Sequence, residues 1–118
     1  MFSVGILTLS DKGSRGERED LSGPEIRQII ASLPGRVEAY EIIPDEEEMI
    51  SRKLVEYADQ KCLNLILTTG GTGLSPRDVT PEATRKVLDK EVPGIAEVMR
   101  AEGMKITPTA MLSRAAAG

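Results

Sequence analysis

Three short apolar runs alternate with longer amphipathic stretches along the chain. The runs have the length and the β-branched content of strands, and each ends at a turn-forming cluster. The third run is apolar enough to be buried on both faces of a sheet. We therefore expect strands over residues 4–9, 37–43 and 63–68.

The amphipathic stretches predict helices. Apolar residues recur at helical intervals behind Ser22, Asp45 and Thr80, which stand where N-caps are expected. Glu25 completes a capping-box spacing with Ser22, and Pro81 takes the first helical position behind Thr80. These patterns predict helices over residues 22–33, 45–60 and 80–92, followed by a short helix over residues 95–99.

The alternation of strands and helices predicts an α/β fold. Such a chain forms a mostly parallel sheet with right-handed crossovers and helices on its faces. Ligands of open α/β sheets bind beyond the carboxyl ends of the strands. The loops over residues 10–16, 44–45 and 69–80 follow these ends, and we expect them to share one rim.

Composition narrows the chemistry of such a rim. The 118 residues suffice for one domain and include no His, which excludes Ser-His-Asp machinery and His-ligated zinc. The single cysteine, Cys62, forms no internal disulfide, and its apolar neighbours predict a buried structural thiol. Carboxylates, Lys, hydroxyls, backbone amides or a hard cation such as Mg²⁺ must therefore carry any reaction.

Charge and hydropathy exclude two classes of partner. Fifteen Lys and Arg against nineteen Asp and Glu give a net charge of −4, and few aromatic residues are present for base stacking, so nucleic acid is not expected. The apolar runs are too short to span a membrane. The first run lacks a basic segment before it, so it is interpreted as the first strand of a cytoplasmic protein.

The glycine-rich segment from Thr69 to Gly73 is the strongest single motif. Its glycines allow positive φ and let main-chain amides approach an anion closely. It is not a Walker A loop, because no Gly-Lys-Ser/Thr follows. Two interpretations remain open for the segment alone, a phosphate-binding loop and a tight strand-to-helix turn.

Charged side chains near the predicted rim also have two interpretations each. Arg77 can hold phosphate oxygens and Asp78 can hold Mg²⁺, or the two can form a plain surface salt bridge. Asp45 can be a helix N-cap or a metal ligand. Asp11 is by default a turn-forming residue.

Five motifs together resemble one family. They are LTLSDKGSRGEREDLSG (7–23), IPDE (43–46), TTGGTG (68–73), PRDVTPEAT (76–84) and PTAMLSR (108–114). In this order they closely resemble the MogA/MoaB-type molybdopterin adenylyltransferases of molybdenum cofactor biosynthesis. The resemblance covers essentially the whole chain.

The resemblance implies a three-layer α/β/α fold of the molybdopterin-binding-domain type, commonly a homotrimer. It implies transfer of AMP from Mg-ATP to the terminal phosphate of molybdopterin, with release of pyrophosphate, and a molybdate-insertion (MoeA-type) partner. Asp45 and Asp78 match the family's catalytic carboxylates and are expected to help hold Mg²⁺. The residues expected to bind substrate are Thr69, Gly70, Gly71, Thr72, Gly73, Arg77, Ser10, Asp11 and Ser113.

Alternatives to this activity stay open at this point. Some MoaB-type relatives are not the working adenylyltransferase, so a non-catalytic pterin-binding or assembly protein fits the same motifs. A fold-level relative with a different nucleotide substrate is a third interpretation. Family members continue beyond the PTAMLSR motif into a strand, a loop and a helix, so we expect residues 1–118 to form one domain that lacks this C-terminal segment.

Overall fold

The computed structural model describes residues 1–118. In chain order its elements are β1 (Phe2–Leu9), α1 (Asp11–Ser14), α2 (Ser22–Ala31), β2 (Gly35–Ile43), α3 (Glu47–Val55), the π-helix η1 (Glu56–Gln60), β3 (Leu65–Thr69), α4 (Thr80–Arg85), α5 (Pro93–Met104) and the 3-10 helix η2 (Pro108–Leu112). No helix combines the length and the apolar character that a membrane crossing requires.

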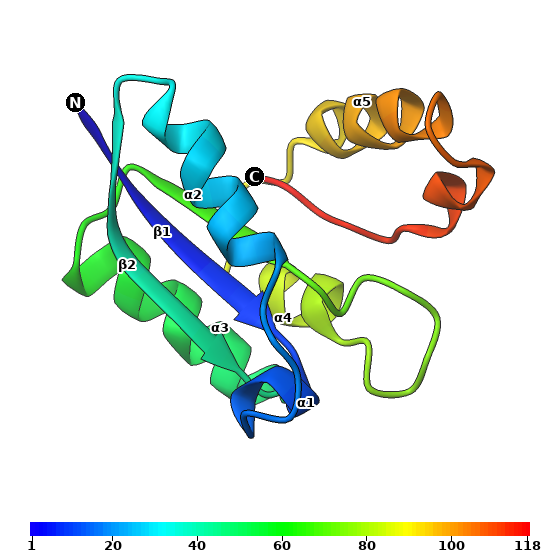
Figure 1. The fold of residues 1–118 in the computed structure, drawn as a ribbon, viewed down its shortest axis with the longest axis horizontal. Helices are drawn as coiled ribbons and strands as arrows, with labels where there is room; N and C mark the ends of the chain where they lie inside the picture. The colour runs from blue at the N-terminus through cyan, green and yellow to red at the C-terminus, as the bar shows by residue number, and fades with distance from the viewer.

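The three strands form one parallel sheet in the order β2-β1-β3, which confirms the predicted α/β class. Leu9 at the end of β1 is paired with Ile43 of β2, and Thr8 is paired with Thr69 of β3. All three strands therefore end at the same edge. This register brings the three loops that follow them to one rim of the molecule (Figure 1).

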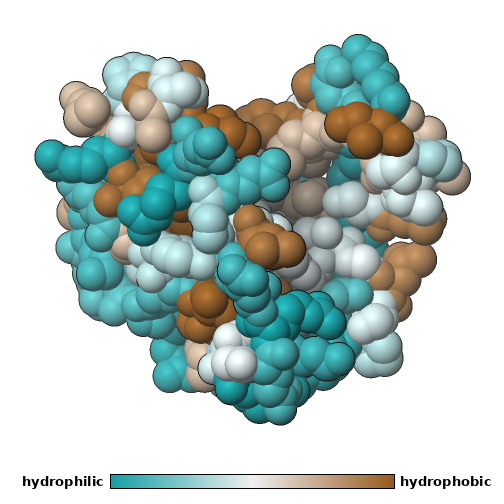
Figure 2. Space-filling model, viewed as in Figure 1, coloured by the Kyte–Doolittle hydropathy of each residue, from teal (hydrophilic) through white to brown (hydrophobic).

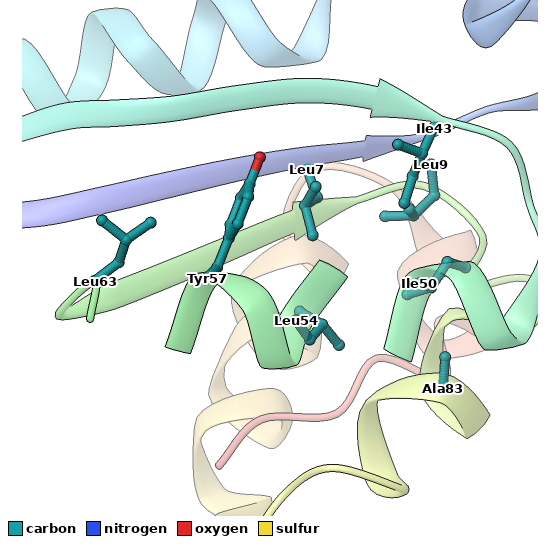
Figure 3. Close-up of a cluster of buried hydrophobic side chains, with 8 residues drawn as sticks. All are labelled: Leu7, Leu9, Ile43, Ile50, Leu54, Tyr57, Leu63 and Ala83. Carbon is teal, nitrogen blue, oxygen red and sulfur yellow. The ribbon is translucent and has the colours of Figure 1, made fainter. Parts of the chain in front are cut away.

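The alternation of β1 side chains divides the core into two layers. Val4 and Ile6 pack with Ile30 of α2 on one face of the sheet. Leu7 and Leu9 pack on the other face with residues of α3, η1 and α4, as Figure 3 shows. Helices thus cover both faces, and the three-layer α/β/α arrangement is confirmed (Figure 1).

Tyr57 occupies the centre of the larger core layer. Its side chain is fully buried and extends toward β1 (Figure 3). A Cβ added to Gly5 of β1 would lie 2.6 Å from Tyr57 Cδ2 and 2.7 Å from Leu63 Cδ1. The strand therefore carries glycine here because the tyrosine ring fills the space of a side chain.

None of the three predicted N-cap side chains caps its helix. Ser22 and Thr80 are already the first residues of α2 and α4, and the N-cap position of α3 is held by Glu46 rather than Asp45. The side chains of Asp45 and Thr80 bond to other loops instead. Tertiary contacts therefore override the local capping signals.

The segment behind α4 also departs from prediction. The helix ends at Arg85 rather than near residue 92, because the amides of Val87 and Leu88 both bond to the Thr84 carbonyl and tighten the chain into a turn. Residues 93–104 then form α5, the longest helix, where only a short one was expected.

Two expectations about burial are wrong. Strand β3 is an edge strand rather than a central one, so Leu65 is 38% exposed. Cys62 is exposed, because it sits at the turn that ends η1 with a left-handed φ of 53°. Helix α5 packs against η2 beside the sheet (Figure 1). Its apolar residues Ile95, Val98 and Met99 are exposed to solvent. Figure 2 shows a hollow in the surface between α5 and the rest of the molecule.

Candidate functional site

The loops behind β1 and β2 are joined by two aspartates that exchange hydrogen bonds. The Asp11 amide donates to Oδ2 of Asp45 at 3.1 Å, and the Asp45 amide donates to Oδ1 of Asp11 at 3.0 Å. Each carboxylate thus holds the backbone of the other loop. The convergence predicted for these two loops is confirmed.

Arg77 connects the third loop to the same pair. Its Nε donates to Oδ2 of Asp11 at 3.0 Å, and its Nη2 donates to Oδ1 at 2.9 Å. Such a two-point guanidinium–carboxylate contact fixes both partners. The alternative of a salt bridge between Arg77 and its neighbour Asp78 is wrong, since the partner of Arg77 is Asp11, 66 residues away.

The glycine loop reaches the end of β1 at close range. Gly70 and Gly71 have φ values of 100° and 67°, which side-chain-bearing residues rarely adopt. The Thr80 hydroxyl donates to the Gly70 carbonyl at 2.9 Å, and the Thr80 amide donates to the Gly71 carbonyl at 3.1 Å. The first turn of α4 therefore holds the loop in place.

Asp45 presents a buried, unpaired oxygen to this loop. Its Oδ1 is buried without a hydrogen-bond partner, and a Cβ on Gly71 would lie 3.1 Å from it. Burial raises the pKa of Asp45, and the carboxylates of Asp11 and Asp78 add to the rise, whereas the bond with Asp11 and the charge of Arg77 oppose it. An unpaired buried acceptor with a raised pKa is typical of a functional site.

Asp78 lies on the same loop but has a local partner. Its Oδ2 accepts a hydrogen bond from the Ser75 amide at 3.0 Å, and a Cβ on Gly73 would lie 2.8 Å from this oxygen. Its charge still contributes to the raised pKa of Asp45. The two predicted catalytic carboxylates therefore belong to one electrostatic environment.

Arg114 is a rim residue that the sequence interpretation missed. Its Nε donates to the Gly73 carbonyl and its Nη2 to the Asp78 carbonyl, both at 2.8 Å. Its Nη1 pairs with Glu82 Oε2 at 2.6 Å, and its amide donates to the Thr72 carbonyl at 2.9 Å. Only its place in the PTAMLSR motif drew attention to this segment, because no periodicity reveals such a contact.

A hollow of about 440 Å³ lies on the C-terminal side of the glycine loop. It is lined by Thr72, Gly73, Leu74, Thr109, Leu112 and Ser113. Ser113, predicted to border the pocket, is therefore placed beside the loop. Ser10 has a different local role, since its hydroxyl caps α1 by accepting from the Gly13 amide at 3.0 Å.

The carboxylates of the rim suit a cation only if a ligand completes its shell. No three metal-ligating side chains lie close enough together to hold an ion by themselves. Mg²⁺ needs only one or two carboxylates where substrate phosphates and water supply the remaining oxygens. The unpaired Oδ1 of Asp45 provides such an oxygen, so the residues present fit Mg²⁺ bound together with phosphates.

The fold and rim define a class: an α/β domain whose candidate ligand site lies at the carboxyl edge of a parallel sheet, around a glycine loop and acidic side chains. Residues 5–118 match the family model described as a probable molybdopterin binding domain. The chain belongs to this family.

Individual relatives agree with this assignment. The chain is 45% identical over 117 residues to a protein of Helicobacter pylori strain J99 named molybdopterin adenylyltransferase. That match covers 98% of this chain, which spans 66% of the length of the relative.

Solved structures extend the comparison to the fold. The molybdopterin biosynthesis enzyme MoaB of Thermus thermophilus is 59% identical with a TM-score of 0.94, over 100% of this chain and 74% of that one. The tungsten cofactor synthesizing protein MoaB of Pyrococcus furiosus is 40% identical with a TM-score of 0.89, over 99% and 72% of the two chains.

Proposed function

We propose that this protein is a molybdopterin adenylyltransferase of molybdenum cofactor biosynthesis. The observation that carries the proposal is the buried, unpaired oxygen of Asp45, which faces the glycine loop at the rim where Arg77 and Asp78 also lie. The name of the Helicobacter pylori relative supports the same activity.

In this reaction the terminal phosphate oxygen of molybdopterin forms a bond to the α-phosphorus of ATP. The bond from that phosphorus to the bridging oxygen breaks, and pyrophosphate leaves. The nucleophile is already an ionised phosphate, so the absence of His is no obstacle. The barrier lies mainly in bringing anions together in line, which positioned donors and cations address.

Each part of the rim has a role in this proposal. The residues from Thr69 to Gly73 bind the pterin phosphate, and Arg77 holds phosphate oxygens. Ser113 and the hollow beside it receive part of a substrate, while Ser10 and Asp11 form the border of the pocket. Arg114 keeps the loop in position through the carbonyls of Gly73 and Asp78.

Asp45 and Asp78 are the proposed catalytic carboxylates and the residues that would hold Mg²⁺. When bound, Mg²⁺ would neutralise charge on the phosphates of ATP. The contribution of the chain itself is to fix Asp45 through the Asp11 amide and to fix Asp78 through the Ser75 amide.

The proposal also covers the oligomeric state, the cellular location and the partner of the protein. We propose a homotrimer that works in the cytoplasm, where its co-substrate ATP is available, and that passes its product to a molybdate-insertion (MoeA-type) partner. Residues 1–118 would form one molybdopterin-binding domain.

One alternative follows from the same family resemblance. The two structural relatives described above are both named MoaB, and a MoaB-type chain can be a non-catalytic pterin-binding or assembly protein. Such a protein would bind molybdopterin without binding Mg-ATP. Calorimetry with molybdopterin and with Mg-ATP distinguishes the enzyme from the binding protein.

The proposal is tested by pyrophosphate release from molybdopterin and Mg-ATP. We expect turnover in the unaltered chain, and a fall of about 100-fold in Asp45→Asn and in Asp78→Asn. Glu48→Gln is the matched control, since it removes one exposed carboxylate at the start of α3 and should leave turnover unchanged. Full turnover in a folded Asp45→Asn or Asp78→Asn variant would remove that residue from the mechanism.

A further inference from the structure

The guanidinium of Arg77 is paired with a carboxylate of the chain itself. Two of its nitrogens donate to the two carboxylate oxygens of Asp11, although its side chain is 57% exposed. Asp11 belongs to the loop behind β1 and Arg77 to the loop behind β3. The ion pair therefore closes a bridge across the rim at the place where a phosphate would bind.

We propose that Asp11 is a resident counter-ion for Arg77, and that a phosphate group displaces it from the guanidinium when substrate binds. This inference rests on the proposed function only in requiring that the ligand carries a phosphate. It makes Asp11 a positioning residue that competes with the ligand, in place of a direct ligand contact.

The shape of the two partners supports an exchange. A guanidinium offers its paired donors to a carboxylate and to a phosphate in the same fork geometry, so one anion replaces the other without rearranging the arginine. The donors Nε and Nη2 point at Asp11 and cannot serve both anions in this way. Asp11 thus keeps the Arg77 guanidinium in place until a phosphate binds to it.

Asp11 also has a second anchor that survives the exchange. Its Oδ1 accepts from the Asp45 amide at 3.0 Å, and its own amide donates to Asp45 Oδ2. Release of Arg77 therefore leaves the loops behind β1 and β2 joined. The exchange therefore breaks one ion pair and leaves the other contacts of the rim in place.

Selectivity for ligand charge follows from this competition. A singly charged anion gains little by replacing a carboxylate, whereas a phosphate or pyrophosphate carries more charge and more acceptor oxygens. The site should therefore favour phosphate esters and polyphosphates over carboxylates. A direct contact between Asp11 and a phosphate would instead bring two negative groups together.

The experiment measures the affinity of inorganic pyrophosphate, in EDTA, by calorimetry. Asp11→Asn keeps an acceptor for the Asp45 amide but removes the charge that holds Arg77. We expect about fivefold tighter binding in this variant, the factor that corresponds to loss of a partly exposed ion pair. The gain should vanish in the double variant Asp11→Asn/Arg77→Gln when it is compared with Arg77→Gln.

Glu17→Gln is the matched control for net charge. It removes a carboxylate of the same loop that pairs with Arg15 and should leave pyrophosphate affinity unchanged. An equal gain in Glu17→Gln, or unchanged or weaker binding in Asp11→Asn, would overturn the proposal. A gain that persists in the Arg77→Gln background would also overturn it.

A spectroscopic readout follows Arg77 in the unaltered chain. The Nε–H resonance of Arg77, assigned by its loss in Arg77→Gln, should shift when pyrophosphate is added to the unaltered chain. An unmoved resonance at saturating pyrophosphate would refute the exchange. Neither measurement needs adenylyl transfer, so a failed transfer assay with these shifts present would reject the proposed function alone.

Discussion

Gly70 shows how a single residue brings the glycine loop to the sheet. Its φ is 100°, and a Cβ on it would overlap the carbonyl oxygen of Leu9 at the end of β1. Both the conformation and the close approach require glycine. The loop can therefore lie directly against the central strand, whose end is the middle of the rim.

Gly70→Ala should be costly for both of these reasons. We expect a loss of at least about 3 kcal/mol in the free energy of unfolding, since the overlapping atom is backbone and cannot move aside cheaply. Gly16→Ala is the matched control. Gly16 also has a positive φ, of 74°, but nothing lies within 4 Å of its added Cβ, so its loss should be about 1 kcal/mol.

Urea unfolding followed by circular dichroism gives both values. Similar losses in the two variants would mean that the overlap with Leu9 has no energetic weight, and that only the backbone conformation matters. A folded Gly70→Ala variant should also bind pyrophosphate more weakly than the Gly16→Ala variant, because only Gly70 lies in the binding loop.

At the scale of elements, the sequence predicts what hydrophobic periodicity encodes. The three strands and the first two main helices lie within a few residues of the expected positions, because alternating and helical apolar patterns are local signals. Strand β3 was expected to be buried on both faces because its run is apolar, yet the order β2-β1-β3 makes it an edge strand. Local sequence patterns do not predict the order of the strands in a sheet.

The same limit applies to the site. The rim itself was predicted, since the carboxyl ends of parallel strands must meet, and Asp11, Asp45 and Arg77 do lie together there. Their pairing was not predicted, and neither was the role of Arg114, because these contacts join residues more than 30 positions apart. Local rules instead assigned Asp45 to a helix cap that it does not form.

Arg114 makes one element-scale prediction, because it ties the segment behind η2 to the glycine loop and to α4. Arg114→Ala should lower the free energy of unfolding by about 1 to 3 kcal/mol, since it leaves the carbonyls of Gly73 and Asp78 without this donor. Amide hydrogen exchange over residues 72–78 should accelerate. Arg114→Lys retains the charge but not the fork, so its effects should be intermediate.

Exchange measured by mass spectrometry on the three proteins tests this role. Unchanged protection of residues 72–78 in Arg114→Ala would show that the loop holds its conformation without the Arg114 guanidinium. Unchanged protection with lower stability would place the role of Arg114 in the packing of the C-terminal segment, outside the site.

At the scale of the whole molecule, the carboxyl groups favour the folded state at neutral pH. The pKa is lowered by folding at Asp11, Glu17, Asp20, Glu56 and Glu82 and is raised at Asp45. Four of the lowered groups owe their shift first to a basic side chain. Asp20 differs, because burial works to raise its pKa and is outweighed by bonds from Tyr40, Gly23 and Thr8.

A carboxyl whose pKa is lowered by folding stabilises the protein above its unfolded pKa, about 4, and this contribution is lost as the pH falls through the folded value. Five lowered groups against one raised group therefore predict lower stability at pH 3 than at pH 7. Asp20 should carry a disproportionate share, because it is the least exposed to solvent screening of the five and joins β1, β2 and the start of α2.

Asp20→Asn should therefore be less stable than the unaltered chain at pH 7, and the difference should shrink as the pH falls toward 3. Urea unfolding of both proteins at the two pH values measures the difference, and Glu17→Gln provides a control whose exposed pair with Arg15 should hardly change the pH dependence.

At high pH the stability should change in the opposite direction, falling as the pH rises. Burial and the bond to Asp20 raise the pKa of Tyr40 to about 12, so stability should fall again as the pH rises from 10 toward 12. A Tyr40→Phe variant that loses stability as steeply as the unaltered chain in that range would show that ionisation of Tyr40 beside Asp20 does not cause the loss.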